Sequence, residues 1–505
     1  MTAETARILP GLEGAPEQVD LVVVGLGVTG AGVALDAASR GLTVLAVDAH
    51  DVAFGTSRWS SKLVHGGLRY LASLQFGIAH ESAVERGILM ERTAPHLTRP
   101  LPWLLPLSSN VSFTQATLAA AGFQTGDLLR LAARTGRDTL PRPRRVSRTE
   151  ALGLAPALRS AGLRGGLIYW DGQLEDDARL VTCLARTAAA HGAQVRTRVR
   201  VLEATGTTVQ LRDELTGDTR TVTARAVVNA AGVWAGDLVD EIRLRPSRGT
   251  HVVLRAETIP GLRSALTVPV PGSTSRYVFA LPQPDGTIFV GLTDEPVDGE
   301  IPDVPQPTEG EIGFLLDVLA AALDRPVKRS DVVGAFAGLR PLLEADGSTS
   351  DLSRKHAVLT SRSGVVTVVG GKLTTYRQMA EDAVDATGLT TRPCRTQDLP
   401  LLGAASRDVL AQVEEPARLV RRFGTEARYV IDEAVRATRL PEEELVAPGP
   451  AGVTLAELVF GVTHEGAVDA DDLLDRRTRV GLVPEDREAA LPLAERALAL
   501  AGARL

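Results

Sequence analysis

The sequence predicts a mixed fold in which an α/β domain with parallel strands is combined with an α+β region of antiparallel strands and followed by a helical domain. Three observations predict it. A strand, a glycine turn, a helix and a second strand follow one another at residues 20–48, short strand patterns fill residues 245–296, and residues 405–505 have the pattern of amphipathic helices. At roughly 150 residues per domain, a chain of 505 residues with 44% hydrophobic side chains is long enough for several domains with substantial cores.

The composition argues against several classes of protein. The net charge is −7, from 55 basic and 62 acidic residues, so we expect no nucleic-acid partner. The two cysteines, Cys183 and Cys394, lie in no metal-binding spacing, so we expect no metal site and a reduced, cytosolic location. No apolar stretch approaches the length of about 18 residues that a transmembrane helix needs, and residues 1–19 lack the apolar core of a secretory signal.

The unit at residues 20–48 has the glycine spacing of a dinucleotide-binding turn. Gly25 permits the tight turn after the first strand, Gly27 allows the backbone to approach a pyrophosphate, and Gly30 allows the helix to pack closely on the strand. The helix N-terminus then faces the anion, and Asp48, which ends the second strand, can accept hydrogen bonds from a ribose. The alternative is an ordinary glycine-rich turn between a strand and a helix.

Residues 56–70 gather side chains that suit an anionic ligand. The segment contains several hydroxyls together with Lys62, His65, Arg69 and Tyr70. Lys62 is informative because the chain has 51 arginines and only four lysines, and a compact ammonium cannot always be replaced by a guanidinium. The alternative is a polar surface loop.

The segment between residues 77 and 148 raises the question of a membrane contact. A helix is predicted for residues 77–94, and a short, proline-interrupted apolar run follows at 101–107. A basic patch comes next, with seven arginines: Arg130, Arg134, Arg137, Arg142, Arg144, Arg145 and Arg148. The apolar run and the basic patch together suit a membrane surface, and the alternative is a buried strand followed by a solvated loop.

The middle of the chain predicts further strands that lead to a second small-residue turn. A helix is expected near 175–191, and strand patterns occupy 193–210 and 219–229. The turn at Gly232 then allows the backbone to come close to a cofactor, although a plain junction between a strand and a helix has the same pattern.

The strand-rich region at 245–296 contains one histidine of interest, and an arginine of interest follows it. A hairpin signal lies at 284–286, and His251 opens one of the apolar strands, where a lone histidine is more often structural than catalytic. Arg340 lies in an apolar segment, and a buried arginine needs an anionic partner.

A second glycine turn, at residues 370–371, follows a buried strand and leads into a helix that begins after Lys372. Lys62 and Lys372 thus both lie beside glycine-rich turns that suit anions, whereas Lys328 and Lys355 lie in polar, solvated segments.

Several blocks of sequence are characteristic when they are taken together. They are GLGVTGAG at 25–32, SSKLVHGGLRYL at 60–71, DDARL at 176–180, GLRPL at 338–342, GGKLTTYR at 370–377, HEGA at 464–467 and DDLLDRRT at 471–478. Through these blocks, over roughly residues 18–480, the chain resembles the FAD-dependent glycerol-3-phosphate dehydrogenases. The SSKLVHGGLRYL block is highly specific, and the glycine fingerprint alone is not.

The resemblance implies a D-amino-acid-oxidase-like fold with a Rossmann-type FAD-binding domain, an antiparallel-sheet substrate domain and a C-terminal helical domain. The oxidoreductase region is expected at 18–390 and the helical domain at 395–505. Within the first region, the FAD domain is expected at about 18–75, 150–235 and 335–390, and the substrate domain at about 76–149 and 236–334.

The activity that the resemblance implies is oxidation of sn-glycerol 3-phosphate to dihydroxyacetone phosphate, with FAD as cofactor and a membrane quinone as the final acceptor. Members of the family associate with the inner face of the cytoplasmic membrane without spanning it. Whether the chain forms a homodimer stays open.

Three other activities compete. A glycerol-3-phosphate oxidase would use oxygen and release hydrogen peroxide, but such oxidases tend to carry an insertion that this chain lacks. An amino-acid or amine oxidase would not need so many cations. A non-enzymatic flavin-binding scaffold would need neither the cations nor the histidines.

The resemblance also assigns residues to the substrate. Arg69, Tyr70, Arg340 and Lys372 are expected to bind it, because a phosphate dianion needs cationic partners. His251 is the favoured base for the C2 hydroxyl and His65 is the second candidate, with a flavin contact as its alternative role. Arg340 is also expected to stabilise negative charge on the C2 oxygen.

The FAD contacts that the resemblance implies are Gly25, Gly27, Gly30, Asp48, Thr56, Ser57, Gly232, Lys372, Leu373 and Thr374. Two departures from the family pattern stand out. Asp48 replaces the glutamate of many members, and Arg58–Trp59 stands where small residues are usual, which puts the turnover rate in question more than the identity.

Overall fold

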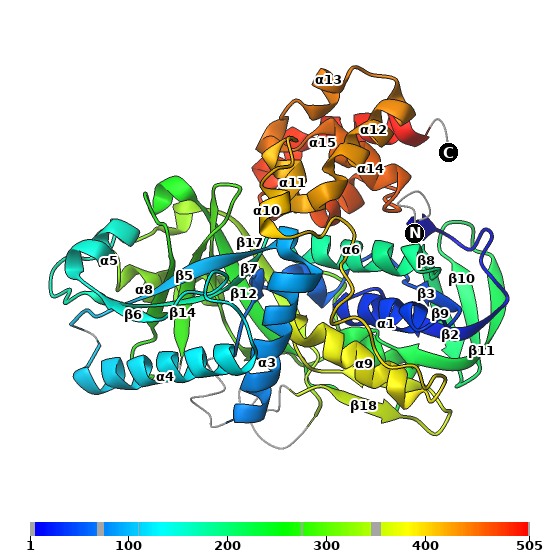
Figure 1. Cartoon of the computed structure of the whole chain (residues 1–505), viewed down its shortest axis with the longest axis horizontal. Coiled ribbons are helices and arrows are strands. Elements are labelled where there is room, and N and C mark those ends of the chain that lie inside the picture. Colours follow the sequence, from blue (N-terminus) through cyan, green and yellow to red (C-terminus); the bar gives the residue numbers. More distant parts are fainter. Residues whose placement is uncertain (1–5, 68–74, 110, 274–275, 345–354, 503–505) are drawn as a thin grey trace.

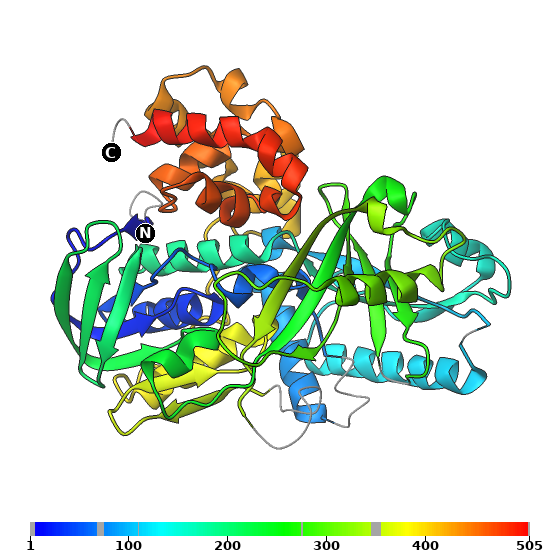
Figure 2. The same cartoon turned by 180° about the vertical axis from the view of Figure 1, so that it is seen from behind.

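The computed structural model describes residues 6–67, 75–109, 111–273, 276–344 and 355–502. Two large sheets lie side by side, each accompanied by helices, and a bundle of helices from the last hundred residues sits on one side of both (Figures 1 and 2). This arrangement confirms the fold class that the sequence predicts: a Rossmann-type domain, a mostly antiparallel domain and a C-terminal helical domain.

The first sheet is parallel in its centre and antiparallel at one edge. β2 lies between β3 and β11 with parallel register, and β19 continues the parallel order from β11. The alternate residues of β2 enter different cores, which explains its unbroken apolar sequence. The strands are β1 (Leu9–Pro10), β2 (Gln18–Val24), β3 (Val44–Val47), β8 (Gln194–Thr197), β9 (Val199–Ala204), β10 (Thr208–Asp213), β11 (Thr219–Asn229), β18 (Ala357–Thr360) and β19 (Val366–Val369).

Three helices cover one face of the first sheet, and the first of them packs against the other two. They are α1 (Val28–Ser39), α6 (Asp177–Ala190) and α9 (Tyr376–Ala386). The short helix α7 (Ala235–Leu238) adds to the core on the opposite face. The N-termini of α1 and α9 follow the two glycine turns predicted from the sequence, so both turns open at the same edge of the sheet.

The second sheet is antiparallel except where β13 pairs with β5. The hairpin predicted at 284–286 joins β14 to β15, as expected. The strands are β4 (Leu63–Val64), β5 (Thr98–Pro106), β6 (Arg144–Val146), β7 (Gly166–Leu174), β12 (Ser247–Arg255), β13 (Ala265–Pro269), β14 (Tyr277–Pro282), β15 (Thr287–Gly291), β16 (Glu295–Pro296) and β17 (Val332–Arg340).

The helices of the second domain cover different parts of its sheet. α8 (Glu309–Ala320) and α5 (Arg148–Leu154) pack on the core of one face. α3 (Phe76–Ile88) passes between the two domains, and α4 (Phe113–Ala132) runs along the outer edge of the molecule (Figure 1). The predicted helix at 77–94 is shorter than expected, because the chain forms a separate π-helical turn at Leu89–Thr93.

The apolar run at 101–107 does not form a membrane contact. It belongs to β5, which pairs with β7 along its whole length, and Trp103 and Leu104 are 3% and 0% exposed. The buried-strand alternative is therefore correct for this run. The strand expected over 193–210 is also divided, since Arg198 adopts a positive φ of 59° between β8 and β9.

The C-terminal domain is helical, as predicted. Its helices are α10 (Arg407–Leu410), α11 (Ala417–Phe423), α12 (Ala427–Thr438), α13 (Glu442–Val446), α14 (Leu455–Thr463) and α15 (Pro484–Gly502). Buried arginine–carboxylate pairs join this domain to the first, among them Arg179–Glu465, Arg186–Glu426 and Asp176–Arg422. No helix in the described part of the chain is both long enough and apolar enough to cross a membrane.

Candidate functional site

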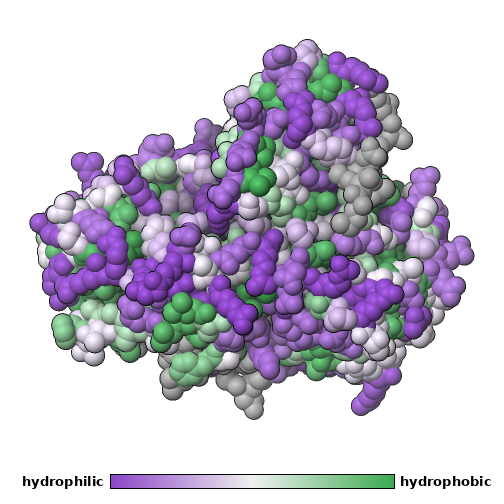
Figure 3. Space-filling model, in the orientation of Figure 1, coloured by the Kyte–Doolittle hydropathy of each residue, from purple (hydrophilic) through white to green (hydrophobic). Residues whose placement is uncertain are grey.

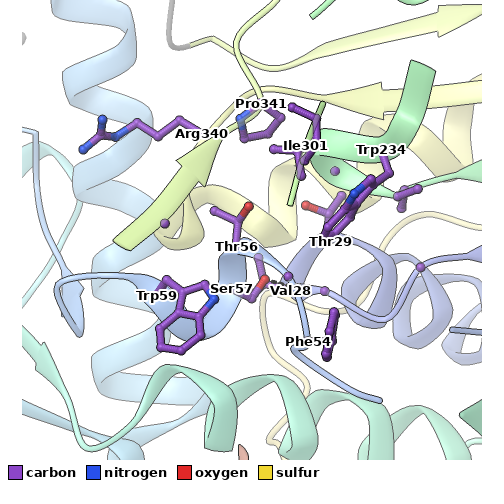
Figure 4. Close-up of a pocket in the computed structure, with 18 of the residues that line it drawn as sticks. Val28, Thr29, Phe54, Thr56, Ser57, Trp59, Trp234, Ile301, Arg340 and Pro341 are labelled. Carbon is purple, nitrogen blue, oxygen red and sulfur yellow. Dashed lines mark hydrogen bonds between the residues drawn. The ribbon is translucent and has the colours of Figure 1, made fainter. Parts of the chain in front are cut away.

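A cavity of about 890 Å³ opens where the carboxyl ends of the parallel strands meet the second sheet. Residues from both domains line it (Figure 4). Phe54, Thr29 and Trp234 lie toward one end, and Arg340 and Trp59 lie toward the other. A site at the carboxyl edge of a parallel sheet is where such folds bind dinucleotides.

The first glycine turn forms the wall of the cavity beside α1. Gly25 has a φ of +97°, and a Cβ atom there would lie 2.7 Å from the carbonyl oxygen of Ala230. Gly30 does not line the cavity; a Cβ atom on it would lie 1.8 Å from the oxygen of Gly25, so it is the residue that allows α1 to pack against the turn. Gly27 lines the cavity at the N-terminus of α1, which leaves the positive end of the helix facing the space.

Asp48 lies at the end of β3 beside the same space. One carboxylate oxygen accepts a hydrogen bond from the backbone N–H of Leu26 at 2.7 Å, and the other accepts from that of His50 at 2.9 Å. Burial raises the pKa of Asp48 to about 6, although the two backbone hydrogen bonds act in the opposite direction. Each oxygen keeps further acceptor capacity for a diol.

The loop after β3 adds the predicted hydroxyls. Ser57 Oγ accepts the backbone N–H of Val28 at 2.9 Å, which ties the loop to the first turn of α1. Thr56 Oγ1 donates to the backbone oxygen of Leu339 at 2.6 Å. Both residues line the cavity, and so does Trp59, at the position where the sequence departs from the family pattern.

The second glycine turn forms another part of the cavity wall. Gly370 and Gly371 have φ values of +77° and +71°, and Lys372, Leu373 and Thr374 follow at the N-terminal side of α9. Lys372 Nζ donates to Ser82 Oγ on α3 at 2.6 Å. Gly232 and the three residues after the glycine turn all line the cavity.

Two histidines and an arginine line the part of the cavity formed by the second sheet. The Nε2 atom of His251, on β12, lies 2.8 Å from Ser61 Oγ, and burial together with the charges of Lys62 and Arg340 lowers the pKa of His251 to about 3. His65 lines the same cavity, and its backbone N–H donates to Thr374 Oγ1 at 3.2 Å.

Arg340 already has an anionic partner within the protein. Its Nη1 donates to Asp294 Oδ1 at 3.1 Å and to Ser247 Oγ at 3.2 Å, while its Nη2 donates to the backbone oxygen of Thr293 at 3.1 Å. The requirement that a buried arginine has a partner is thus met by Asp294. The side chain keeps 20% exposure, so it can also face a ligand.

The structure therefore brings together, on one cavity, every predicted site residue that it describes except Gly30 and Lys62. Arg69 and Tyr70 lie outside the described residues. Lys62 differs from expectation, since it is 0% exposed and its Nζ contacts the oxygen of Arg58 at 2.6 Å and Asp177 Oδ2 at 3.0 Å. It is a buried structural cation and does not line the cavity.

Some lining residues were not predicted as site residues. Ser61 lies inside the specific sequence block, and its hydroxyl could have been considered there. Leu202 and Ile301 come from an edge strand and a distant loop, and no motif marks them. Only the folded chain brings them to the cavity.

Comparison with known proteins identifies the chain at family level. Residues 20–377 match the family model of FAD dependent oxidoreductases, and residues 394–505 match the C-terminal domain of alpha-glycerophosphate oxidase. Glycerol-3-phosphate dehydrogenase 1 of Mycobacterium tuberculosis is 53% identical over 489 residues, which cover 94% of each chain. The chain belongs to the family of FAD-dependent glycerol-3-phosphate dehydrogenases.

Two further relatives have lower sequence identity to this chain. The aerobic glycerol-3-phosphate dehydrogenase of Staphylococcus aureus is 35% identical over 92% of this chain and 87% of its own. The solved structure of the glycerol-3-phosphate dehydrogenase from Bacillus halodurans, complexed with FAD, superposes with a TM-score of 0.73 at 29% identity over 97% of this chain and 92% of the other. FAD is the cofactor of the family, and the glycine turns, the N-terminus of α1 and Asp48 fit it.

Proposed function

We propose that the chain oxidises sn-glycerol 3-phosphate to dihydroxyacetone phosphate. The observation that carries the proposal is the composition of the cavity. A dinucleotide-binding turn forms one part of it, Lys372 follows the second glycine turn, and Arg340 and two histidines lie where the second sheet completes it. The relatives named glycerol-3-phosphate dehydrogenase support the choice of substrate.

In this proposal the substrate phosphate is bound by cations. Lys372 and Arg340 are the described candidates, and both are long enough to exchange part of their present contacts for a phosphate oxygen. Arg69 and Tyr70 complete the proposed set. A phosphate dianion held by several cations would fix the position of C2, which is the main requirement for reaction.

The oxidation removes two hydrogens from the substrate. FAD, when bound, supplies the acceptor for the hydrogen and electron pair that leave C2. The chain itself must take the proton of the C2 hydroxyl, and His251 and His65 are the candidate bases, since both line the cavity. Arg340 is proposed to stabilise negative charge on the C2 oxygen while that proton leaves.

We propose a membrane quinone, and not oxygen, as the final acceptor. The chain aligns with the Mycobacterium tuberculosis dehydrogenase over 94% of both sequences, which leaves no room for a long insertion relative to that protein. A glycerol-3-phosphate oxidase remains the second candidate, supported by the match of residues 394–505 to the C-terminal domain of alpha-glycerophosphate oxidase.

A quinone acceptor requires contact with the membrane surface, and α4 supports such a contact. Its outer face exposes Phe113 (80%), Leu118 (67%) and Leu128 (65%), and its two charged residues, Asp127 and Arg130, pair with each other at 2.7 Å. Pale-green and green side chains gather along this edge in Figure 3, at the place where Figure 1 draws α4. We propose peripheral association through α4 and the exposed arginines that follow it, on the cytoplasmic side of the membrane.

The proposal is tested by mixing the purified holoenzyme with sn-glycerol 3-phosphate without oxygen. We expect the visible absorption band of the flavin to bleach, and to return on addition of a soluble quinone faster than on addition of air. A flavin that dithionite reduces but sn-glycerol 3-phosphate does not would contradict the substrate. Faster return in air, with release of hydrogen peroxide, would favour the oxidase.

A further inference from the structure

The C-terminal domain contacts the loop that follows β3 through two consecutive arginines. Asp51 on this loop is 0% exposed, and it accepts a hydrogen bond from Arg476 Nε at 2.7 Å. Arg477 donates two more to the same carboxylate, both at 2.8 Å. The three hydrogen bonds use both oxygens of Asp51, so the carboxylate is held in one orientation.

A second contact holds the other end of the same loop. The Arg58 side chain is 4% exposed, and its guanidinium lies 4.2 Å from the centre of the Trp59 ring and 5.2 Å from that of Phe54. Its Nε donates to the backbone oxygen of Phe54 at 2.9 Å, and its Nη1 lies 3.5 Å from Asp475 Oδ2. Arg58 and Trp59, which depart from the family pattern, thus face the C-terminal domain and the cavity respectively.

The partners of both contacts come from one turn, Asp472–Arg477. Asp472 holds the turn itself, since it accepts from Arg198 Nη2 at 2.8 Å and from the backbone N–H of Val468 at 2.9 Å. Arg476 also bonds to Asp472. These hydrogen bonds fix the position of the turn, and with it the positions of the side chains that contact the loop.

The loop between the two contacts carries much of the cofactor wall. Asp48 and His50 precede Asp51, and the cavity residues Phe54 to Ser57 lie between Asp51 and Arg58. This segment forms no strand, and Ala53 within it adopts a φ of 58°. Backbone hydrogen bonds anchor single points of it, from the N–H of Ala53 to the oxygen of Leu26 at 2.9 Å and from the N–H of Arg198 to the oxygen of His50 at 2.8 Å. The contacts of Asp51 and Arg58 hold the same segment from the side of the C-terminal domain.

We infer that the turn Asp472–Arg477 is a positioning element for FAD: Arg476 and Arg477 through Asp51, and Asp475 through Arg58, hold the loop at residues 48–59 in the shape that binds the cofactor. The C-terminal domain then contributes to FAD affinity although no residue of this turn lines the cavity. The inference depends on FAD binding in this cavity and not on which alcohol is oxidised, so it survives if the proposed substrate is wrong.

A contact that only stabilises the interface between the domains should affect the melting temperature and not the affinity for FAD. The pair Arg186–Glu426 belongs to the same interface, with side chains 1% and 10% exposed and a distance of 2.9 Å, but neither residue lines the cavity. Breaking the Arg186–Glu426 pair, or the contact of Asp51 with Arg476 and Arg477, should weaken the docking of the C-terminal domain on the first domain. Only breaking the Asp51 contact should also change the loop that binds FAD.

The test compares Arg477→Gln and Asp475→Asn with the control Arg186→Gln. For each variant, the dissociation constant of FAD is measured by flavin fluorescence, and the melting temperature is measured with and without added FAD. We expect the two turn variants to bind FAD at least about tenfold more weakly, because the binding-competent shape of the loop becomes a minor population. The control should lower the melting temperature and leave the dissociation constant within about twofold.

Two further variants cover the case in which Arg477→Gln does not fold. Asp475 is 27% exposed, so its variant should fold even if Arg477→Gln does not. Arg477→Lys, which keeps the charge but cannot bond to both oxygens at once, should fall between wild type and Arg477→Gln. Wild-type FAD affinity in the folded turn variants, or an equal loss of affinity in Arg186→Gln at the same melting temperature, would overturn the inference.

Discussion

Ser61 Oγ lies 2.8 Å from Nε2 of His251, although the two residues are 190 positions apart in the sequence. The His251 ring is stacked on Phe336 with 4.7 Å between ring centres, and a Cβ atom at Gly291 would lie 2.3 Å from its Cδ2. The ring is 1% exposed and has no space to turn, whereas Ser61 is half-buried on the wall of the cavity. The Ser61 hydroxyl is therefore placed to pass a proton between the cavity and His251.

This geometry predicts that Ser61→Ala lowers the rate of flavin reduction by about 100-fold, the lower range for losing a proton-transfer path. The affinity for FAD and the melting temperature should stay close to wild type, since the Ser61 hydroxyl bonds to no other side chain in the described part of the chain. Stopped-flow absorbance of the holoenzyme without oxygen measures the rate. Ser61→Thr keeps the hydroxyl and should retain most of the rate, whereas full activity in Ser61→Ala would make His251 a structural residue.

The two candidate bases should differ in their effect on the pH profile. The pKa of His251 is lowered to about 3 from 6.5, so its ring stays neutral above about pH 4 and cannot produce a loss of rate between pH 8 and pH 5. If the rate of flavin reduction at saturating substrate falls as the pH is lowered through that range, this acidic limb of the pH profile must come from another group. We expect His65→Asn to remove such a limb and His251→Asn to lower the rate without moving it. A limb that moves in His251→Asn alone would assign the base to His251.

Arg340 is expected to act in the reaction and not in cofactor binding. Arg340→Ala should lower the rate of flavin reduction by about 1000-fold, the upper range for losing one charge-stabilising donor, while FAD remains bound. Because the change also leaves Asp294 without its arginine, Asp294→Asn is the matched control. The assignment fails if Asp294→Asn loses as much rate as Arg340→Ala, since that result would make the pair structural.

Much of the first domain could be predicted from sequence because its signals are local. The turn at Gly25, Gly27 and Gly30 and the acid at Asp48 lie within one βαβ unit, where spacing alone decides geometry. The hairpin at 284–286 is equally local. The second glycine turn could also be predicted, because a glycine pair between an apolar strand and a helix is compatible with few structures other than a tight turn.

The errors and omissions have physical causes as well. Residues 101–107 suggested a membrane contact because an apolar run has no periodicity that separates a buried strand from a lipid-facing segment. Lys62 was expected near a ligand, whereas Asp177 neutralises it in the interior and burial lowers its pKa. The contact of Asp51 with Arg477 spans 426 residues, and no local pattern announces it.

Asp48 predicts a pH dependence of FAD affinity. Its pKa in the absence of cofactor is about 6, raised from 3.8 by burial, and the ionised form accepts stronger hydrogen bonds from a ribose diol than the protonated form does. Binding should therefore weaken as the pH falls through about 6, by about tenfold at pH 5 relative to pH 7.5, and should be constant above about pH 7. Fluorescence titration of the apoprotein with FAD measures this. Asp48→Asn cannot titrate, so the same slope in that variant would assign it to a different group.

The exposed face of α4 predicts how the protein meets a membrane. Phe113 and Leu128 are 80% and 65% exposed on a helix face that carries no exposed charge, so transfer to lipid would remove apolar surface from water without burying a charge. Phe113→Ser with Leu128→Ser should weaken binding to anionic phospholipid vesicles by about 100-fold, at roughly 1.5 kcal/mol per side chain. Leu215→Ser, on a side chain 54% exposed but remote in sequence from α4, is the control and should bind as wild type.

The exposed arginines that follow α4 allow a second test, because the apolar and electrostatic contributions to vesicle binding respond differently to salt. Arg142, Arg144 and Arg145 are exposed, and Arg144 is partly neutralised by its pair with Glu150. Changing all three to glutamate should weaken vesicle binding at low salt and have less effect at high salt, whereas the loss in the α4 double variant should persist at both. Equal sedimentation of the double variant and wild type with vesicles would remove α4 from the membrane contact, and the exposed apolar face would then need another partner.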